Sequence, residues 1–177
     1  MSLRTFVATL AIGCALLACS GQVHRPDGGI GMLRAGSVAP NFVATDGVGK
    51  ATQLADARGT PSVVYFYPKD ETPGCTKEAC AFRDAWDKLA GAHVTVFGIS
   101  RDSAESHALF RDKFKLPFAL VADPDGAISR AYGVRSTLGM AERVTFLVGA
   151  DGRIAKVYPD VDPAVHVAEL LDDVGKL

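Results

Sequence analysis

The sequence predicts a single α/β domain whose central β-sheet contains strands of both directions. Apolar stretches of strand length, beginning at 62–67, alternate with amphipathic stretches of helix length as far as residue 132. Two further apolar stretches, 143–148 and 153–158, are joined by Gly-Ala-Asp-Gly, a turn typical of an antiparallel hairpin. The alternation predicts parallel strands and the hairpin adds antiparallel ones, so we expect a mixed sheet flanked by helices.

The first half of the domain centres on a strand, a loop and a helix. The strand, 62–67, is rich in β-branched and aromatic residues and ends at Pro68. Helix-favouring residues then run from Cys75 to Ala90, and Gly91 ends them. Upstream of this unit we expect a short turn at 55–59 and, before it, a hairpin in which 42–45 and 51–54 flank Asp46-Gly47-Val48-Gly49.

The second half repeats the alternation and then adds the hairpin. Asp102 or Ser103 is expected to cap a helix that continues to Lys115. Its apolar positions at helical spacing are Ala104, Ala108, Leu109 and Phe114. The other expected elements are a strand at 93–100, a strand at 118–122, a helix at 124–132 ended by Gly133, strands at 143–148 and 153–158, and a helix at 162–174.

The composition agrees with one domain that has an ordinary hydrophobic core. The chain has 177 residues, of which 48% are hydrophobic and 22% are charged. Nineteen Lys and Arg against twenty Asp and Glu give a net charge of -1, and no run of basic residues forms a patch that could follow a phosphate backbone. We therefore expect no nucleic-acid partner.

Residues 1–18 predict a lipoprotein signal peptide rather than a transmembrane helix. The stretch 6–17 is almost wholly apolar but is shorter than the roughly 20 residues that a membrane span needs. It leads into Leu16-Leu17-Ala18-Cys19, which resembles the lipobox of bacterial lipoproteins, so Cys19 is expected to carry the lipid after cleavage. The alternatives are a cut before Cys14, which has a poorer residue three positions upstream, and a plain secretory peptide.

The glycine-rich stretch 19–33 is expected to form a lipidated, flexible tether that joins the membrane to a domain at 34–177. The domain would then face the periplasm of a bacterial cell envelope. Ser20 after the lipid cysteine, in place of an aspartate, favours the outer over the inner membrane by analogy with enteric bacteria.

Cys75 and Cys80 are the two thiols left for this domain. A disulfide between residues five apart closes too short a loop to add much stability, so a purely structural bond is weakly motivated. Cys75 opens the predicted helix, where unpaired backbone N–H groups and the helix dipole favour negative charge. We therefore expect Cys75 to be a reactive thiolate.

An ordered set of short motifs surrounds Cys75 and continues to the end of the chain. Pro68, Thr72 and Cys75 form P-x-x-x-T-x-x-C. The other matches are Lys69-Asp70, Gly74-Cys75-Thr76, Cys80, Phe82-Arg83-Asp84, Ala39-Pro40-Asn41-Phe42, Ala131-Tyr132-Gly133-Val134 and Arg143-Val144-Thr145-Phe146-Leu147. Over residues 34–177 the chain thus resembles the Q-type peroxiredoxins, also called bacterioferritin comigratory proteins.

The resemblance implies a thioredoxin-like fold with peroxiredoxin additions and a peroxidase without cofactor or metal. Cys75 would be the peroxidatic cysteine, whose thiolate attacks the O–O bond of hydrogen peroxide or an organic hydroperoxide and becomes a sulfenic acid. Cys80 would resolve that acid as a disulfide before it is oxidised further. The resemblance also implies a monomer.

Three further residues receive roles from the resemblance. Thr72 would contact the thiol or a peroxide oxygen, Pro68 would line the pocket and shield the cysteine, and Arg143 would hold the thiolate and orient the peroxide. Without the resemblance, Thr72 could be a helix cap and Pro68 the mere end of a strand. The arginines that rival Arg143 are Arg83, Arg130 and Arg135.

The spacing of the two cysteines adds a mechanical prediction. Five residues of α-helix rise about 7.5 Å, whereas a disulfide needs Cα atoms within roughly 6.8 Å. We therefore expect the first turns of the helix, about 76–82, to unwind when the Cys75–Cys80 bond forms.

Two other functions fit the cysteine spacing less well than the peroxidase. A thioredoxin-like disulfide reductase uses C-x-x-C, but four residues separate the cysteines here. A copper(I) chaperone on a similar fold needs C-x-x-x-C and a histidine, and a zinc site needs a second ligand pair. His93, His107 and His166 follow no ligand pattern, so we expect each at the surface or an edge, whereas Tyr65, Tyr67 and Trp86 are expected in the core or pocket wall.

Each turnover would leave a disulfide that another molecule must reduce. The bacterial periplasm is kept oxidising, and cytosolic thioredoxin does not reach it. We therefore expect a membrane-fed thioredoxin-like protein or a small thiol as the reductant.

Overall fold

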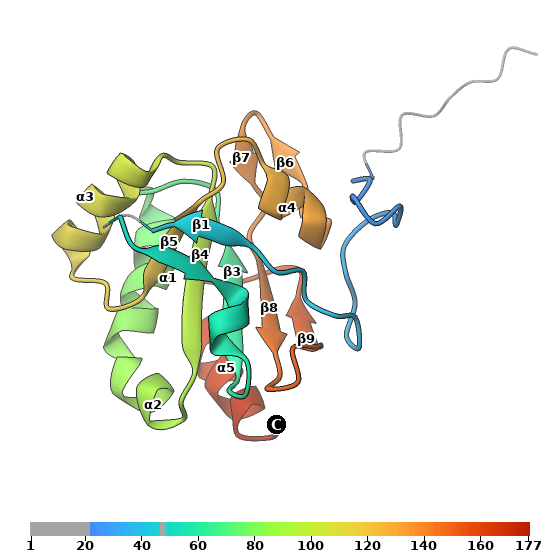
Figure 1. Ribbon diagram of the computed structural model, residues 1–177. Helices are drawn as coiled ribbons and strands as arrows, with labels where there is room; N and C mark the ends of the chain where they lie inside the picture. Colours follow the sequence, from blue (N-terminus) through green and yellow to red (C-terminus); the bar gives the residue numbers. More distant parts are fainter. Residues whose placement is uncertain (1–21, 47–48) are drawn as a thin grey trace, which may run out of the picture.

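A five-stranded β-sheet forms the centre of the protein in the computed structural model, which describes residues 22–46 and 49–177 (Figure 1). The strand order is β5-β4-β3-β8-β9, in which β3, β4 and β5 are parallel while β8 is antiparallel to both of its neighbours. The strands are β3 (Ser62–Phe66), β4 (Thr95–Ser100), β5 (Ala119–Ala122), β8 (Val144–Val148) and β9 (Ile154–Tyr158). The predicted mixed sheet is confirmed.

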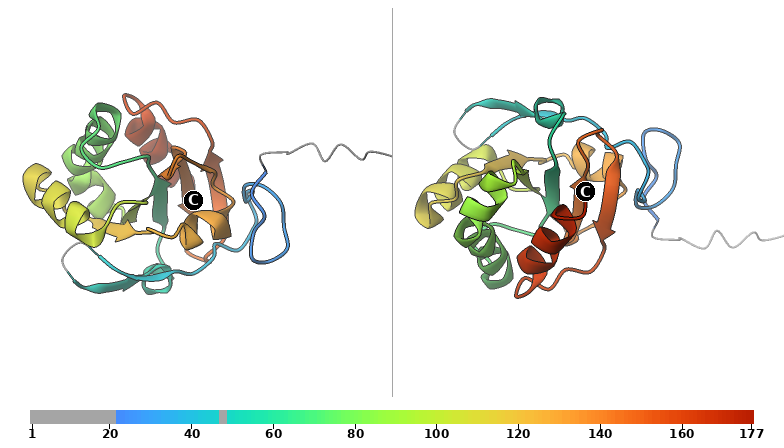
Figure 2. Two further views of the ribbon diagram at one scale, coloured as in Figure 1. Left: turned by 90° about the horizontal axis from the view of Figure 1, so that it is seen from above. Right: turned by 90° about the horizontal axis from the view of Figure 1, so that it is seen from below.

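Side chains of alternate residues along β3 enter two separate cores, one on each face of the sheet. Val63 and Tyr65 face the core that α1 (Pro73–Asp84), α2 (Trp86–Gly91), α3 (Ala104–Phe114) and α5 (His166–Val174) cover. Val64 and Phe66 face the core that α4 (Ala127–Tyr132) and the N-terminal segment cover, and this segment includes the hairpin of β1 (Val43–Thr45) and β2 (Ala51–Gln53). In Figure 2, α1 and α5 accordingly lie on the opposite side of the sheet from the β1–β2 hairpin.

The helix that carries both cysteines, α1 (Pro73–Asp84), begins two residues earlier than predicted and ends sooner. Thr72 occupies its N-cap and Pro73 its first position, where a missing N–H costs nothing. At Ala85 the backbone leaves the helical conformation, and α2 (Trp86–Gly91) follows, so the single helix predicted to Ala90 is wrong. Alanine is itself a good helix former, and the break accompanies the packing of Trp86 on Phe118.

Helix α3 (Ala104–Phe114) turns a different face to the core than predicted. Ser103 caps it by accepting a hydrogen bond from the Ser106 backbone at 3.3 Å. His107 and Phe110 are fully buried, whereas Leu109, one of the predicted apolar positions, is 70% exposed. The buried stripe therefore includes a histidine, which the apolar pattern could not reveal.

The remaining elements agree with the predicted order. The hairpin β1 (Val43–Thr45) and β2 (Ala51–Gln53) is followed by the short 3₁₀ helix η1 (Leu54–Ala57). Helix α4 (Ala127–Tyr132) ends at Gly133, where a Cβ would lie 2.0 Å from the Gly31 carbonyl oxygen, so only glycine fits. Helix α5 (His166–Val174) begins four residues later than predicted, and a small hairpin of β6 (Ser136–Thr137) and β7 (Met140–Ala141) was not predicted.

The described part of the predicted tether, from Gln22 onward, makes hydrogen bonds both within itself and to the rest of the domain. The Gly31 backbone donates to the Val23 carbonyl at 2.7 Å, and Leu33 is buried with its N–H donating to the Tyr132 carbonyl at 3.1 Å. The predicted signal peptide with Cys14, and the predicted lipidation site Cys19, lie outside the described residues. Within the part of the chain that the structure describes, none of the helices combines the length and the apolar character that crossing a membrane requires.

Candidate active site

Cys75 lies in the first turn of α1, directly beyond the loop 67–72 that leaves β3. Its side chain is only 2% exposed. Residues in the first helical turn have backbone N–H groups without helical partners, so the thiol lies in a region that favours negative charge.

Arg143 reaches Cys75 because of the strand order. β8 is antiparallel to β3 and pairs Val144 with Phe66, so the residue that enters β8 lies at the end of the sheet from which the loop leaves. The guanidinium Nη2 donates to Cys75 Sγ at 3.2 Å. The rival arginines have other partners: Arg83 bonds Asp84 and the Phe114 carbonyl, Arg130 bonds the Asp125 carbonyl, and Arg135 pairs with Glu142.

Glu78, which was not predicted as a site residue, binds the other side of the same guanidinium. Its side chain is fully buried, and its Oε2 accepts a hydrogen bond from Arg143 Nη1. Burial raises the pKa of Glu78 to about 7, although Arg143 acts to lower it. Glu78 follows Cys75 by three residues, and this spacing on one helix face could have indicated it.

His166 also lies within the electrostatic reach of Arg143. Its ring is buried at the start of α5, and its Nε2 lies 2.9 Å from the Thr145 hydroxyl oxygen. Burial, helped by the charge of Arg143, lowers the pKa of His166 to about 4. The expectation of a surface position is therefore wrong for His166, whose ring packs edge-on against Phe82 and Tyr158.

Of the other positions predicted for aromatic and histidine residues, the structure confirms four and corrects that of His107. Tyr65 and Tyr67 are fully buried and stack at 5.4 Å, and Trp86 packs against Phe118, as expected of core residues. His93 is exposed as predicted. His107 is fully buried, which corrects its predicted surface position, because Asp70 pairs with its ring at 2.9 Å.

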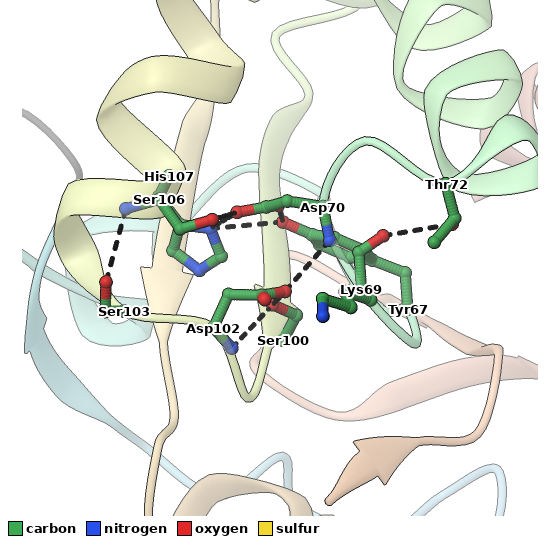
Figure 3. Close-up of polar contacts among 9 residues, drawn as sticks. All are labelled: Tyr67, Lys69, Asp70, Thr72, Ser100, Asp102, Ser103, Ser106 and His107. Atoms are coloured by element: carbon green, nitrogen blue, oxygen red, sulfur yellow. Dashed lines mark hydrogen bonds and ion pairs between the residues drawn. The ribbon is translucent and has the colours of Figure 1, made fainter.

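Thr72 and Pro68 lie in the loop before α1. The Thr72 hydroxyl makes no capping bond to the helix and instead donates to the Lys69 carbonyl at 3.1 Å (Figure 3). The hydroxyl proton is thus engaged, and the oxygen lone pairs are the part that can accept a hydrogen bond from a bound group. Pro68 follows the end of β3 and is half-buried.

Cys80 lies five residues after Cys75 on the same continuous helix. Both cysteines are free thiols; Cys75 is buried and Cys80 is half-buried. The structure is therefore that of the reduced protein with α1 intact. Among residues 22–46 and 49–177, no three or more His, Cys, Asp or Glu side chains are grouped as metal ligands would be.

Comparison with known proteins gives one consistent result. The model of the AhpC/TSA family matches residues 35–157. A peroxiredoxin of Coxiella burnetii with the name bcp is 43% identical over 152 residues, which are 82% of this chain and 99% of that protein. The chloroplast peroxiredoxin Q of rice is 43% identical over 144 residues, or 80% of this chain and 66% of the relative.

Solved structures agree with these sequence matches. Peroxidoxin BcpB from Mycobacterium tuberculosis superposes with a TM-score of 0.77 at 29% identity, covering 82% of this chain and 98% of that one. The bacterioferritin comigratory protein of Xanthomonas campestris, studied for alkyl peroxide reduction, superposes with a TM-score of 0.73 at 31% identity, covering 82% and 96%.

Proposed function

The chain belongs to the AhpC/TSA family, within the group of bacterioferritin comigratory proteins and Q-type peroxiredoxins, and we propose that its reaction depends on the contact between Cys75 and Arg143. As a member of this group it is a thiol-dependent peroxidase of the atypical two-cysteine type. Its substrates are hydrogen peroxide and organic hydroperoxides, and the alkyl peroxide reduction for which the Xanthomonas campestris relative was studied supports the organic class.

In the first step, the Cys75 thiolate attacks one oxygen of the hydroperoxide. The S–O bond forms as the O–O bond breaks, so the thiol is oxidised to a sulfenic acid and the leaving oxygen takes a proton to become water or an alcohol. Arg143 stabilises the thiolate before attack and the oxygens during it, because a guanidinium presents several donors in one plane. Thr72 accepts the hydrogen bond of the peroxide hydroxyl through its free lone pairs.

In the second step, the Cys80 sulfur attacks the Cys75 sulfenic acid. The disulfide forms and the hydroxyl leaves as water after taking a proton. Because both cysteines lie on α1, this step requires its first turns to unwind. A thioredoxin-like dithiol or a small thiol then reduces the disulfide by exchange.

In this proposal the protein acts as a monomer. Cys19 anchors it to the bacterial envelope, with the domain facing the periplasm. The lipobox-like Leu16-Leu17-Ala18-Cys19 supports the anchor. Growth of the producing bacterium with an alkyne-tagged fatty acid tests it: wild type should become labelled and Cys19→Ser should not. Equal labelling of both proteins would contradict the anchor without bearing on the peroxidase.

The peroxidase chemistry is tested by adding one equivalent of hydrogen peroxide to the reduced protein and following both thiols by mass spectrometry. Wild type should lose both thiols quickly and gain a Cys75–Cys80 disulfide. Cys75→Ser should keep its thiol, and Cys80→Ser should accumulate sulfenic or sulfinic acid on Cys75. Oxidation of wild type no faster than that of a free thiol would overturn the proposed roles.

A further inference from the structure

Asp70 lies in the middle of the loop 67–72, and its carboxylate is buried although it is charged. The residue is 6% exposed. Its Oδ1 accepts from the Tyr67 hydroxyl at 2.8 Å, and its Oδ2 lies 2.7 Å from the Ser106 hydroxyl and 2.9 Å from His107 Nδ1 (Figure 3). Three side chains thus converge on one loop carboxylate, two of them from α3.

These partners keep Asp70 ionised. Burial alone would raise the pKa of Asp70, but the hydrogen bond and charge of His107, with the bonds from Ser106 and Tyr67, outweigh it and leave the pKa below its ordinary value. An ionised carboxylate can only accept hydrogen bonds. His107 Nδ1 therefore bears a hydrogen and donates a hydrogen bond to Asp70 Oδ2.

The backbone of the loop is held as well. The Asp70 N–H donates to Asp102 Oδ2 at 2.9 Å, and the Ser100 hydroxyl fixes that same oxygen at 2.7 Å. The next residue, Glu71, has φ +58°, a left-handed conformation that a residue with a Cβ adopts only at a cost. Its side chain pairs with Lys113 of α3 at 3.0 Å.

The anchors of the loop lie on parts of the molecule that contain neither cysteine. Tyr67 is the first residue of the loop and directly follows β3, Ser100 ends β4, and Asp102, Ser106 and His107 belong to α3 or the turn before it. Thr72 comes two residues after Asp70, and its hydroxyl bonds the carbonyl of Lys69, the residue before Asp70. The place of the Thr72 oxygen therefore depends on how the loop is held against α3, as well as on α1, whose Thr76 N–H donates to the Thr72 carbonyl at 2.8 Å.

We propose that Asp70 and His107 are positioning residues for the peroxidase reaction, which hold the loop 67–72 against α3 so that the Thr72 oxygen meets the peroxide at Cys75. Because their partners are not on α1, they keep the loop in place while the first turns of α1 unwind to form the disulfide. This inference rests on the proposed function and adds to it the residues that orient the substrate.

The test compares two reactions of the same thiol in a Cys80→Ser background, where Cys75 is the reactive cysteine under study. Oxidation by hydrogen peroxide needs the loop, whereas alkylation by iodoacetamide needs only an accessible thiolate. In Asp70→Asn and His107→Phe, oxidation should slow by about tenfold to a hundredfold, since small displacements of orienting groups cost this much. Alkylation should stay near the rate of the background protein.

Conservative variants and a control separate positioning from general destabilisation. His107→Asn keeps an N–H donor near the position of Nδ1 and should restore much of the oxidation rate. Tyr67→Phe removes one bond to Asp70, should fold even where Asp70→Asn does not, and should slow oxidation by a smaller factor. Ser103→Ala weakens the cap of the same helix without contacting the loop carboxylate, and should leave the ratio of the two rates unchanged.

The outcomes that overturn the inference differ from those that overturn the proposed function. If the Cys80→Ser protein oxidises quickly but Asp70→Asn, His107→Phe and Tyr67→Phe are equally fast, the positioning role is wrong and the peroxidase stands. The same conclusion follows if oxidation and alkylation fall together, as a structural defect would cause. If the Cys80→Ser protein itself oxidises no faster than a free thiol, the proposed function fails first.

Discussion

Arg143 Nη2 lies 3.2 Å from Cys75 Sγ, although 68 positions separate the two residues in the chain. The contact exists because β8 enters the sheet beside the point where β3 leaves it. The buried Glu78 binds the other terminal nitrogen of the guanidinium, Nη1. Glu78 thus fixes the guanidinium through Nη1, while Nη2 donates to the thiol.

Replacing Arg143 should slow the reaction of Cys75 with peroxide by more than a loss of protein stability could explain. In Arg143→Gln we expect the rate constant for oxidation of Cys75 by hydrogen peroxide to fall about 10²- to 10³-fold, as when one donor to a developing charge is removed. Arg143→Lys should lie between this variant and wild type, because an ammonium cannot bind Cys75 and Glu78 as a fork does. Stopped-flow fluorescence of Trp86 follows the reaction.

Arg135→Gln is the matched control for these variants. Arg135 lies eight residues upstream of Arg143 and pairs with the half-exposed Glu142 at 3.4 Å. Its replacement should leave the oxidation rate near that of wild type. If Arg143→Gln and Arg135→Gln oxidise equally fast, the contact with Cys75 has no role in the reaction.

Unwinding of α1 should be visible in the rate of disulfide formation. Lys77 is exposed in the helix between Cys75 and Cys80, so Lys77→Gly and Lys77→Ala differ mainly in helix propensity, by roughly 1 kcal/mol. If the turn must open before Cys80 attacks, the sulfenic acid should be resolved up to about fivefold faster in Lys77→Gly than in Lys77→Ala. Quenched-flow mass spectrometry measures this step, and identical rates would show that resolution does not wait for the helix.

Two buried groups near Arg143 should give opposite pH dependences of stability. The pKa of Glu78 is raised to about 7, so between pH 4.5 and 7 the folded protein holds a proton that the unfolded chain releases, and this residue makes folding less favourable as pH rises. The pKa of His166 is lowered to about 4, so between pH 6.5 and 4 the unfolded chain binds a proton that the folded protein does not, and folding becomes less favourable as pH falls.

Single substitutions should separate the two effects. On acidification from pH 7 to 4.5, the free energy of unfolding should fall more steeply in Glu78→Gln than in wild type, by about 2–3 kcal/mol. In His166→Gln it should fall less steeply than in wild type over the same range. Urea unfolding across this pH range measures both, and parallel curves for the three proteins would show that neither group titrates as its burial implies.

The sheet and the cysteine-bearing helix could be predicted because their signals are local. Apolar stretches, turn glycines and Pro68 lie within a few residues of the elements they define. The motif around Cys75 similarly led to Arg143, although the roles of Cys75, Cys80 and Thr72 in turnover stay predictions until the variants are measured.

The supporting residues of the site could not be predicted because their partners are distant in sequence. The buried Glu78 pairs with Arg143, which comes just before β8, and the buried His107 pairs with Asp70 of the loop before α1. A polar residue on a helix is predicted to be exposed unless its buried partner is known. The break in the helix at Ala85 was not predicted for a related reason, since tertiary packing there opposes the local helix propensity.

The corrected face of α3 gives the last prediction, through two leucines on different helices. Leu170 of α5 is fully buried in the core beneath α1, whereas Leu109 of α3 is 70% exposed. Leu170→Ala should lower the free energy of unfolding by about 3 kcal/mol, the sum of lost burial and a cavity that the neighbours only partly fill. Leu109→Ala should change it by less than about 0.5 kcal/mol, because little apolar surface is lost and alanine favours the helix. Urea unfolding of both variants decides the matter: equal losses would mean that Leu109 is covered in solution and that the predicted apolar face of α3 has a partner after all.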